Sequence, residues 1–252
     1  MCHESWHPES SSEDLRRSRV FTASDGARIP GWAYGDDGTK GTCLLLPDIF
    51  GPSPFYHHVA GLLGQSGFRT IMVDYFFREG TLQDSSREAA FERRSSMDEN
   101  LCLSDISSVL SQLTEDGTDR TIGVVGFCLS GTFASDLTTM RHDLATVSFY
   151  GFPEGPGGPV ASAAPRPIDV AARFQGPILA FWGDQDRIPV SDLTKFESEA
   201  LTHGADYRQH IYPGAGHGFL QGLVEERPDS ASARNAWSRT LAFLGSHVTS
   251  KS

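Results

Sequence analysis

Three residues of the sequence have side chains that together can perform nucleophilic catalysis: Cys128, Asp186 and His217. A thiol has an unperturbed pKa of about 8.5, so only a few per cent of it is thiolate at neutral pH. A nearby imidazole and the N-terminus of a helix both favour the thiolate. A carboxylate orients the imidazole and stabilises its protonated form. These residue types therefore predict a cysteine nucleophile, a histidine base and an orienting aspartate.

Cys128 lies where one sequence pattern gives way to another. Thr121–Phe127 is an apolar run typical of a buried strand, and a helical pattern begins at Leu129. Gly126 and the small Ser130 flank the cysteine at a distance of two residues, so the chain can turn sharply without a collision. Such a turn exposes a nucleophile between a strand and a helix. Ser130 is the weaker candidate nucleophile, because glycines do not flank it in the same way.

The acid and the base each follow a further predicted strand. Asp186 lies after the strand Pro177–Trp182, and His217 lies in a glycine-rich loop after the strand Tyr207–Tyr212. Asp184 is the competing acid, and Asp186 is favoured because Arg-Ile-Pro follows it. Alone, each of these residues is an ordinary turn or core residue. Their order of nucleophile, acid and histidine is the one that α/β-hydrolases use, so together they favour catalysis.

Short apolar strands that alternate with helices predict a parallel sheet covered on both faces. We expect a single-domain α/β-hydrolase fold over residues 17–248, with a mostly parallel, doubly wound sheet, and a polar N-terminal arm over residues 1–16. The predicted strands are Arg19–Ala23, Arg28–Tyr34, Gly41–Leu46, Arg69–Asp74, Thr121–Phe127, Ala145–Tyr150, Pro177–Trp182 and Tyr207–Tyr212. The predicted helical regions are His58–Gly67, Ser86–Leu113, Leu129–Met140, Ser191–Thr202 and Ser230–His247.

The stretch Phe152–Gly176 is rich in proline, glycine and alanine. It reads equally well as a surface loop or as a flap over the site, because ligands of open α/β sheets bind beyond the carboxyl ends of the strands.

Composition excludes several classes of function. The formal net charge of −11 argues against a nucleic-acid partner, which needs a basic face. Four widely spaced cysteines without a C-x-x-C pair are typical of reduced thiols in a cytoplasmic protein. Neither a signal peptide nor an apolar run of about 18 residues is present, so no membrane association is expected. The histidines lack metal-ligand spacing, and we expect no metal and no cofactor.

Six motifs between about Arg28 and Leu244 resemble the dienelactone hydrolases, and the cysteine nucleophile is the most specific element of this resemblance. The resemblance implies a small-molecule ester or lactone substrate, cleaved through an acyl-enzyme on Cys128. We expect a monomer or a homodimer. The motifs are LLPDIFG at Leu45–Gly51, VDYFFREG at Val73–Gly80, GFCLSG at Gly126–Gly131, FYG at Phe149–Gly151, GDQDRIP at Gly183–Pro189 and GHGF at Gly216–Phe219.

The same resemblance assigns roles around the nucleophile. It implies an oxyanion hole made by the backbone N–H groups of Ile49 and Leu129. Asp48 stands where the family usually has a glutamate that helps to form the thiolate, and its side chain is one methylene shorter. Ser130 replaces the family's usual glycine.

Substrate recognition is where the resemblance is weakest. Arg78 aligns with one of two family arginines that bind a substrate carboxylate, but the second position falls near Gln221, which has no charge. Tyr150 and Phe219 are further expected substrate contacts. An ester or lactone with one acidic group is therefore a better expectation than dienelactone itself. Two alternatives remain open: a non-catalytic protein that binds a small molecule, and an acyl-transfer or cyclising enzyme that uses the same site.

Overall fold

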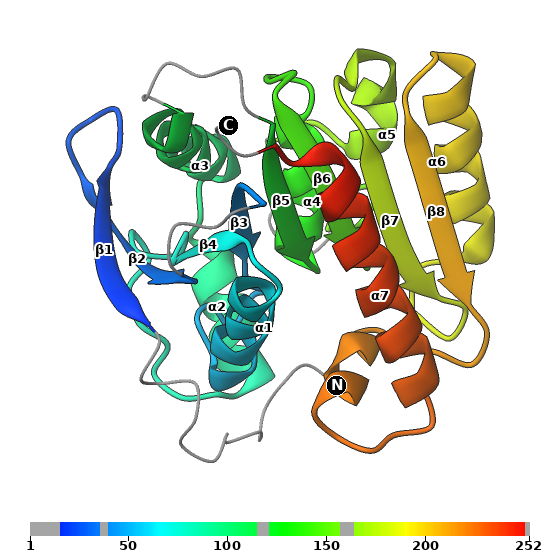
Figure 1. Ribbon diagram of the computed structural model, residues 1–252, viewed down its shortest axis with the longest axis horizontal. Coiled ribbons are helices and arrows are strands. Elements are labelled where there is room, and N and C mark those ends of the chain that lie inside the picture. Colours follow the sequence, from blue (N-terminus) through cyan, green and yellow to red (C-terminus); the bar gives the residue numbers. More distant parts are fainter. Residues whose placement is uncertain (1–15, 36–39, 115–120, 157–163, 250–252) are drawn as a thin grey trace.

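A computed structural model describes residues 16–35, 40–114, 121–156 and 164–249. Its centre is one eight-stranded sheet in the order β1-β2-β4-β3-β5-β6-β7-β8 (Figure 1). The pairs β1–β2 and β2–β4 are antiparallel, and every other neighbouring pair is parallel. The mostly parallel sheet predicted from the sequence is confirmed. The strands are β1 Arg17–Thr22, β2 Arg28–Tyr34, β3 Thr42–Leu46, β4 Arg69–Val73, β5 Ile122–Phe127, β6 Leu144–Phe149, β7 Ile178–Gly183 and β8 Tyr207–Tyr212.

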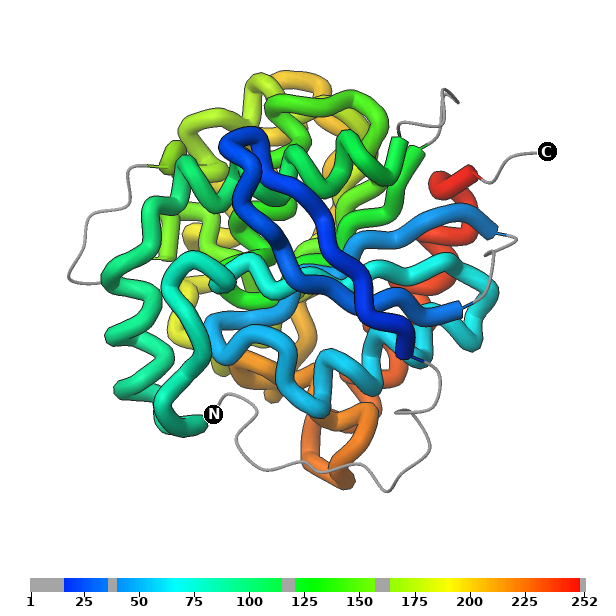
Figure 2. The backbone as a smooth tube through the Cα atoms, turned by 90° about the vertical axis from the view of Figure 1, so that its left-hand side faces the viewer, coloured from blue at the N-terminus to red at the C-terminus, as the bar shows by residue number. Residues whose placement is uncertain are grey.

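The central strands are apolar because helices cover both faces of the sheet. Every residue of β3, β5, β6 and β7 is buried. Continuous burial is typical of parallel strands between two helical layers. The edge strands differ: most of β1 is exposed, and β8 is polar and half-buried. The β1–β2 hairpin runs along one side of the molecule (Figure 2).

Two helices, α1 and α7, lie on the front face of the sheet in Figure 1. Helices α3, α4, α5 and α6 contact one another in series, and α4 packs on β5 and β6. The sheet is thus doubly wound, as predicted. The helices are α1 Pro54–Gln65, α2 Arg87–Ser95, α3 Glu99–Thr114, α4 Leu129–Leu137, α5 Pro167–Val170, α6 Val190–Thr202 and α7 Ser230–His247, with short 3₁₀ turns η2 Ala171–Arg173 and η3 Phe219–Leu223.

The single helical region expected over Ser86–Leu113 is wrong, because the structure divides it into α2 and α3. The Ser86 hydroxyl caps α2 by accepting a hydrogen bond from the Ala89 N–H. The Asp98 carboxylate accepts hydrogen bonds from the N–H groups of Asn100 and Leu101, at the start of α3. Such a cap satisfies N–H groups that have no partner inside the helix, so it begins a new helix.

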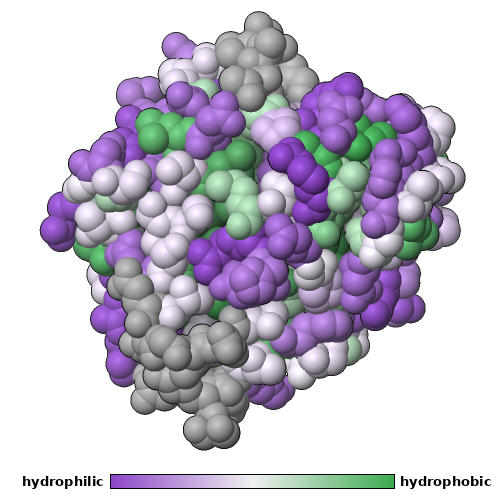
Figure 3. Space-filling view, turned by 90° about the horizontal axis from the view of Figure 1, so that it is seen from above, coloured by the Kyte–Doolittle hydropathy of each residue, from purple (hydrophilic) through white to green (hydrophobic). Residues whose placement is uncertain are grey.

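Two sequence expectations fall partly beyond the described part of the chain. Of the N-terminal arm, residues 1–15 lie outside the described residues, as do residues 157–163 of the segment Phe152–Gly176. The carboxyl ends of β5, β7 and β8 point downward in Figure 1, so the turns that follow these parallel strands lie at the same end of the sheet. Figure 3 shows the surface at the opposite end of the molecule, where hydrophilic residues surround small apolar areas.

Candidate active site

Cys128 occupies the turn between β5 and α4. Its backbone has φ 57° and ψ −118°, a left-handed conformation that costs a non-glycine residue about 1–3 kcal/mol. The Cys128 N–H donates to the Phe149 carbonyl over 3.0 Å, which ties the turn to the neighbouring strand. Helix α4 begins at the next residue, so its N-terminus lies beside the thiol. A helix N-terminus favours negative charge and therefore the thiolate.

Gly126 and Ser130 close this turn. A Cβ atom at Gly126 would lie 2.2 Å from the Ser130 carbonyl oxygen, so no side chain fits there. The Ser130 hydroxyl donates to the Leu46 carbonyl over 2.6 Å and accepts from the Phe127 N–H over 2.8 Å. Ser130 thus links the ends of β3 and β5 beneath the turn, and its hydroxyl is engaged with the backbone.

The structure brings Asp186 and His217 together. The Asp186 Oδ2 atom lies 2.7 Å from His217 Nδ1, and the aspartate side chain is fully buried. Asp184 instead accepts a hydrogen bond from the Gly214 N–H over 2.7 Å. Of the two aspartates in the loop after β7, Asp186 is therefore the one that orients the histidine, while Asp184 holds the loop after β8.

Aromatic rings surround the imidazole of His217. The Phe152 ring stacks on it at 5.7 Å between centroids, and the Tyr150 ring lies at 4.9 Å. Phe219 is fully buried and packs against Tyr150 from behind. The His217 Nε2 atom is buried and has no hydrogen-bond partner among the described residues. The imidazole is thus held in place. Its Nδ1 atom contacts Asp186, and its Nε2 atom has no hydrogen-bond partner among the described residues.

Several of the site residues predicted from the sequence line one small pocket of about 90 Å³. Cys128, Asp186 and His217 line it, together with Ile49 and Leu129. Within the described residues, the N–H groups of Ile49 and Leu129 donate no hydrogen bond. The pocket therefore holds a thiol, an imidazole and two candidate oxyanion donors in one place.

The remaining wall of the pocket is cationic and aromatic, and none of its arginines was predicted from the sequence motifs. Helix α2 contributes Arg87, Phe91 and Arg94, at intervals of four and three residues. Residues at this spacing share one face of a helix, so the sequence held a usable signal. On the other side, the Arg187 guanidinium lies over the Phe152 ring at 4.8 Å. Among the described residues, three arginines thus line the pocket, in a chain whose net charge is −11.

Asp48 is buried one residue before Ile49. Burial raises its pKa from 3.8 to about 7, while the Phe50 N–H, the Tyr56 hydroxyl and the Arg93 guanidinium act in the opposite direction. The Phe50 N–H donates to Asp48 Oδ1 over 2.9 Å. A carboxyl group with such a pKa exchanges its proton near neutral pH.

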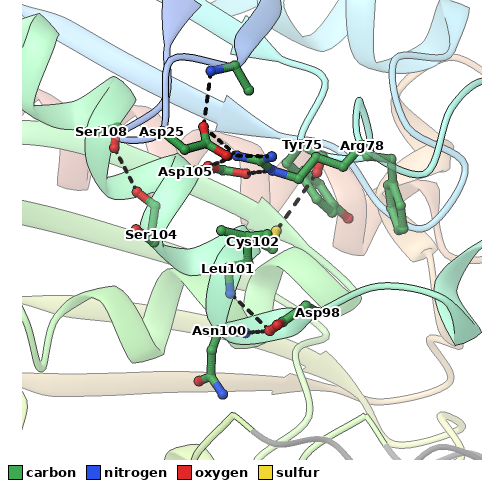
Figure 4. Close-up of polar contacts among 12 residues, drawn as sticks. Asp25, Tyr75, Arg78, Asp98, Asn100, Leu101, Cys102, Ser104, Asp105 and Ser108 are labelled. Carbon is green, nitrogen blue, oxygen red and sulfur yellow. Dashed lines mark hydrogen bonds and ion pairs between the residues drawn. The ribbon is translucent and has the colours of Figure 1, made fainter.

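Arg78 lies elsewhere. Its guanidinium makes two hydrogen bonds to the buried Asp105 carboxylate, at 2.6 and 2.9 Å, and pairs with Asp25 at 3.0 Å (Figure 4). Arg78 is not among the residues that line the pocket. The amide oxygen of Gln221, at the other expected anchor position, accepts from Arg227 over 2.7 Å. The structure therefore joins Arg78 to α3 and the β1–β2 hairpin.

Tyr150 and Phe219 also stand behind the site rather than in its wall. Neither lines the pocket, and each is less than 2% exposed. Tyr150 has φ 41°, an uncommon conformation for a non-glycine residue. Their contacts place both rings where they support the imidazole.

Across the described ranges, no three His, Cys, Asp or Glu side chains are grouped so that they could hold a metal ion. In that same part of the chain, no helix is both long and apolar enough to cross a membrane.

Comparison with known proteins gives consistent matches. The sequence model of the Dienelactone hydrolase family matches residues 29–248. The carboxymethylenebutenolidase of Rhodococcus opacus is 35% identical over 218 residues, which cover 86% of this chain and 85% of that protein. Carboxymethylenebutenolidase 2 of Cupriavidus pinatubonensis is 34% identical over 237 residues, which cover 92% of this chain and 93% of that protein.

Solved structures agree on the fold. A putative dienelactone hydrolase from Klebsiella pneumoniae superimposes with a TM-score of 0.78 at 23% identity, covering 91% of this chain and 98% of that one. An esterase of Pyrococcus furiosus superimposes with a TM-score of 0.67 at 14% identity, covering 93% and 97% of the two chains.

Proposed function

This chain belongs to the dienelactone hydrolase family, within the α/β-hydrolase superfamily, and we propose that it cleaves an ester or lactone through an acyl-enzyme on Cys128. His217 acts as the base and then as the acid, and Asp186 orients it. The observation that carries the proposal is the 2.7 Å contact between Asp186 and His217 Nδ1 beside a pocket that also contains Cys128.

The proposed reaction begins with loss of the thiol proton. His217 Nε2 accepts that proton, and the sulfur attacks the carbonyl carbon of the substrate. Asp48 assists thiolate formation, because its pKa of about 7 suits a base near neutral pH. The N–H groups of Ile49 and Leu129 stabilise the negative oxygen of the tetrahedral intermediate.

Collapse of that intermediate breaks the bond to the alcohol oxygen. The imidazolium of His217 donates its proton to the leaving alkoxide, which leaves an acyl group on the sulfur of Cys128. His217 then removes a proton from a water molecule, whose oxygen attacks the thioester. A second collapse breaks the carbon–sulfur bond and releases the carboxylic acid, and the His217 imidazolium returns its proton to the sulfur, which restores the thiol.

We further propose that the substrate carries a negative charge. Arg87, Arg94 and Arg187 line the pocket, and Asp186, the acidic residue in the lining, is already paired with His217. Arginine binds carboxylates by paired hydrogen bonds. Arg94 also pairs with Glu99 at 3.1 Å, so Arg87 and Arg187 are the better anchors. The two relatives described above are carboxymethylenebutenolidases, and an acidic lactone fits this wall.

The test compares the wild type with Cys128→Ala and His217→Ala on a panel of lactones and p-nitrophenyl esters. We expect turnover to fall at least about 10³-fold in both variants while thermal unfolding stays cooperative. An exposed-surface variant, Lys195→Ala, serves as the matched control. Turnover by Cys128→Ala at the wild-type rate would falsify the proposal. If the wild type binds panel members without turnover, a binding protein is the better account.

A further inference from the structure

The loop that contains Ile49 is held from both sides of that residue. The Tyr75 hydroxyl donates to the Asp48 carbonyl oxygen over 3.1 Å, and the Arg93 Nη2 group donates to the Ile49 carbonyl oxygen over 2.7 Å. Tyr75 follows β4 and Arg93 lies on α2, so two separate elements hold one short loop. Neither Tyr75 nor Arg93 lines the pocket.

These two hydrogen bonds, together with the Gly51 N–H that donates to the same Asp48 carbonyl oxygen over 3.0 Å, hold the direction of the Ile49 N–H. A peptide group is planar, so the Asp48 carbonyl and the Ile49 N–H move as one unit. The Tyr75 hydroxyl therefore holds, from outside the loop, the peptide plane that contains the candidate oxyanion donor, and the Gly51 N–H holds it from within the loop. The Arg93 contact fixes the next peptide plane. With both planes held, the backbone of Ile49 has little freedom to rotate the N–H away from the pocket.

Arg93 is itself firmly placed. Its guanidinium lies 4.1 Å from the centroid of the Phe76 ring, and its Nη1 group donates to the Gly80 carbonyl over 3.3 Å. A Cβ atom at Gly51 would come within 3.4 Å of Arg93 Nη2, so the loop backbone approaches the guanidinium closely. Its positive charge also acts on the buried Asp48. The planar fork thus reaches two carbonyls of different segments, which a lysine cannot reproduce.

From this geometry we infer that Tyr75 and Arg93 are positioning residues for the oxyanion hole. Tyr75 also lies within electrostatic range of Cys128 and Asp48, but the hydrogen bonds of both residues to this loop go to its backbone, so they act through the Ile49 peptide. This inference rests on the proposed function, because it assumes that Ile49 N–H stabilises an oxyanion. A displacement of about 1 Å in such a donor can reduce a rate about 10²-fold.

The experiment uses Tyr75→Phe and Arg93→Lys, with Tyr207→Phe as the matched control. Tyr75→Phe removes one hydroxyl and keeps the buried ring, and Arg93→Lys keeps the charge near Asp48. Tyr207 is a buried tyrosine on β8, whose hydroxyl donates to Gln209. We expect kcat for ester hydrolysis to fall about 10- to 100-fold in the two loop variants, with KM changed less than threefold. Tyr207→Phe should keep the wild-type kcat.

Alkylation of Cys128 by iodoacetamide separates positioning from a general effect on the thiol. This displacement forms no oxyanion, so its rate constant should stay within about twofold of wild type in both loop variants. A wild-type kcat in both variants overturns the inference, and so does a parallel fall in the alkylation rate. If Cys128→Ala retains wild-type turnover, the proposed function fails instead, and that outcome is separate from the other two.

Discussion

The buried carboxyl group of Asp48 connects the site to pH. Because its pKa is raised from 3.8 to about 7, the folded protein disfavours the ionised form. The contribution of this group to stability is therefore full below about pH 4 and is lost as the pH rises through about 7. In the proposed reaction the same group assists thiolate formation. Its ionisation near neutral pH therefore lowers the stability of the fold at the pH where the reaction uses the carboxylate.

Asp48→Asn tests this pH dependence. Asparagine keeps an oxygen for the Phe50 N–H but cannot ionise. From pH 5 to pH 8, the unfolding free energy of the variant should rise by about 3 kcal/mol relative to that of the wild type, because only the wild type must ionise a buried carboxyl group. Urea denaturation at both pH values measures the difference. An equal difference at pH 5 and pH 8 would show that Asp48 does not titrate in this range.

Arg187 lines the pocket, whereas Arg78 binds a buried carboxylate away from it, and an alanine variant of each distinguishes these roles. Arg187→Ala should lower kcat/KM for carboxylate-bearing esters at least about tenfold relative to neutral esters, because it removes an anchor from the pocket wall. Arg78→Ala should leave that ratio unchanged and lower the unfolding free energy by about 3 kcal/mol, because the buried Asp105 loses its partner. A change of substrate preference in Arg78→Ala alone would reverse these assignments.

The sequence predicted where Cys128, Asp186 and His217 lie because each follows a strand, and the carboxyl ends of parallel strands meet at one edge of the sheet. It could not predict the partner of Arg78. That side chain meets Asp105 through the packing of α3, and Asp25 through the position of the β1–β2 hairpin. Both contacts join segments that are distant in the sequence, and no local pattern reports them.

At the scale of elements, the turn between β5 and α4 depends on the hydroxyl of Ser130, which bridges β3 and β5. Ser130→Ala leaves the Leu46 carbonyl and the Phe127 N–H without this buried partner. We expect a loss of about 1–3 kcal/mol in unfolding free energy. Ser95→Ala, at an exposed position of α2 where the hydroxyl donates to the Glu92 carbonyl of the same helix, should change it by less than about 0.5 kcal/mol. Equal effects of the two substitutions would contradict the bridging role.

Helix α2 shows what local patterns miss. The spacing of Arg87, Phe91 and Arg94 on one face of α2 is visible in the sequence. A single long helix would not allow α2 an orientation different from that of α3, so this face was not assigned to the pocket. The break depends on the Asp98 cap, a signal of only a few residues. Once α2 is independent of α3, it can present arginines to the pocket and hold the Ile49 loop through Arg93.

At the scale of the whole molecule, the three cysteines within the described residues occupy different environments. Cys43 and Cys102 lie in the core, where burial raises the pKa of each thiol. Cys128 lines a pocket beside His217. Brief treatment with iodoacetamide at pH 7, followed by peptide mass spectrometry, should therefore label Cys128 at least about tenfold faster than Cys43 or Cys102. In urea the rates should converge; labelling of all three at one rate in the folded protein would contradict this difference.

Detection of the acyl-enzyme tests the central claim most directly. The wild type is mixed with a p-nitrophenyl ester and quenched in acid within milliseconds, and its intact mass and peptides are measured. The account predicts a mass increase equal to the acyl group, located on Cys128, at a rate that matches the release of p-nitrophenol. Hydrolysis without any acyl adduct on Cys128, together with unchanged turnover in Cys128→Ala, would contradict it.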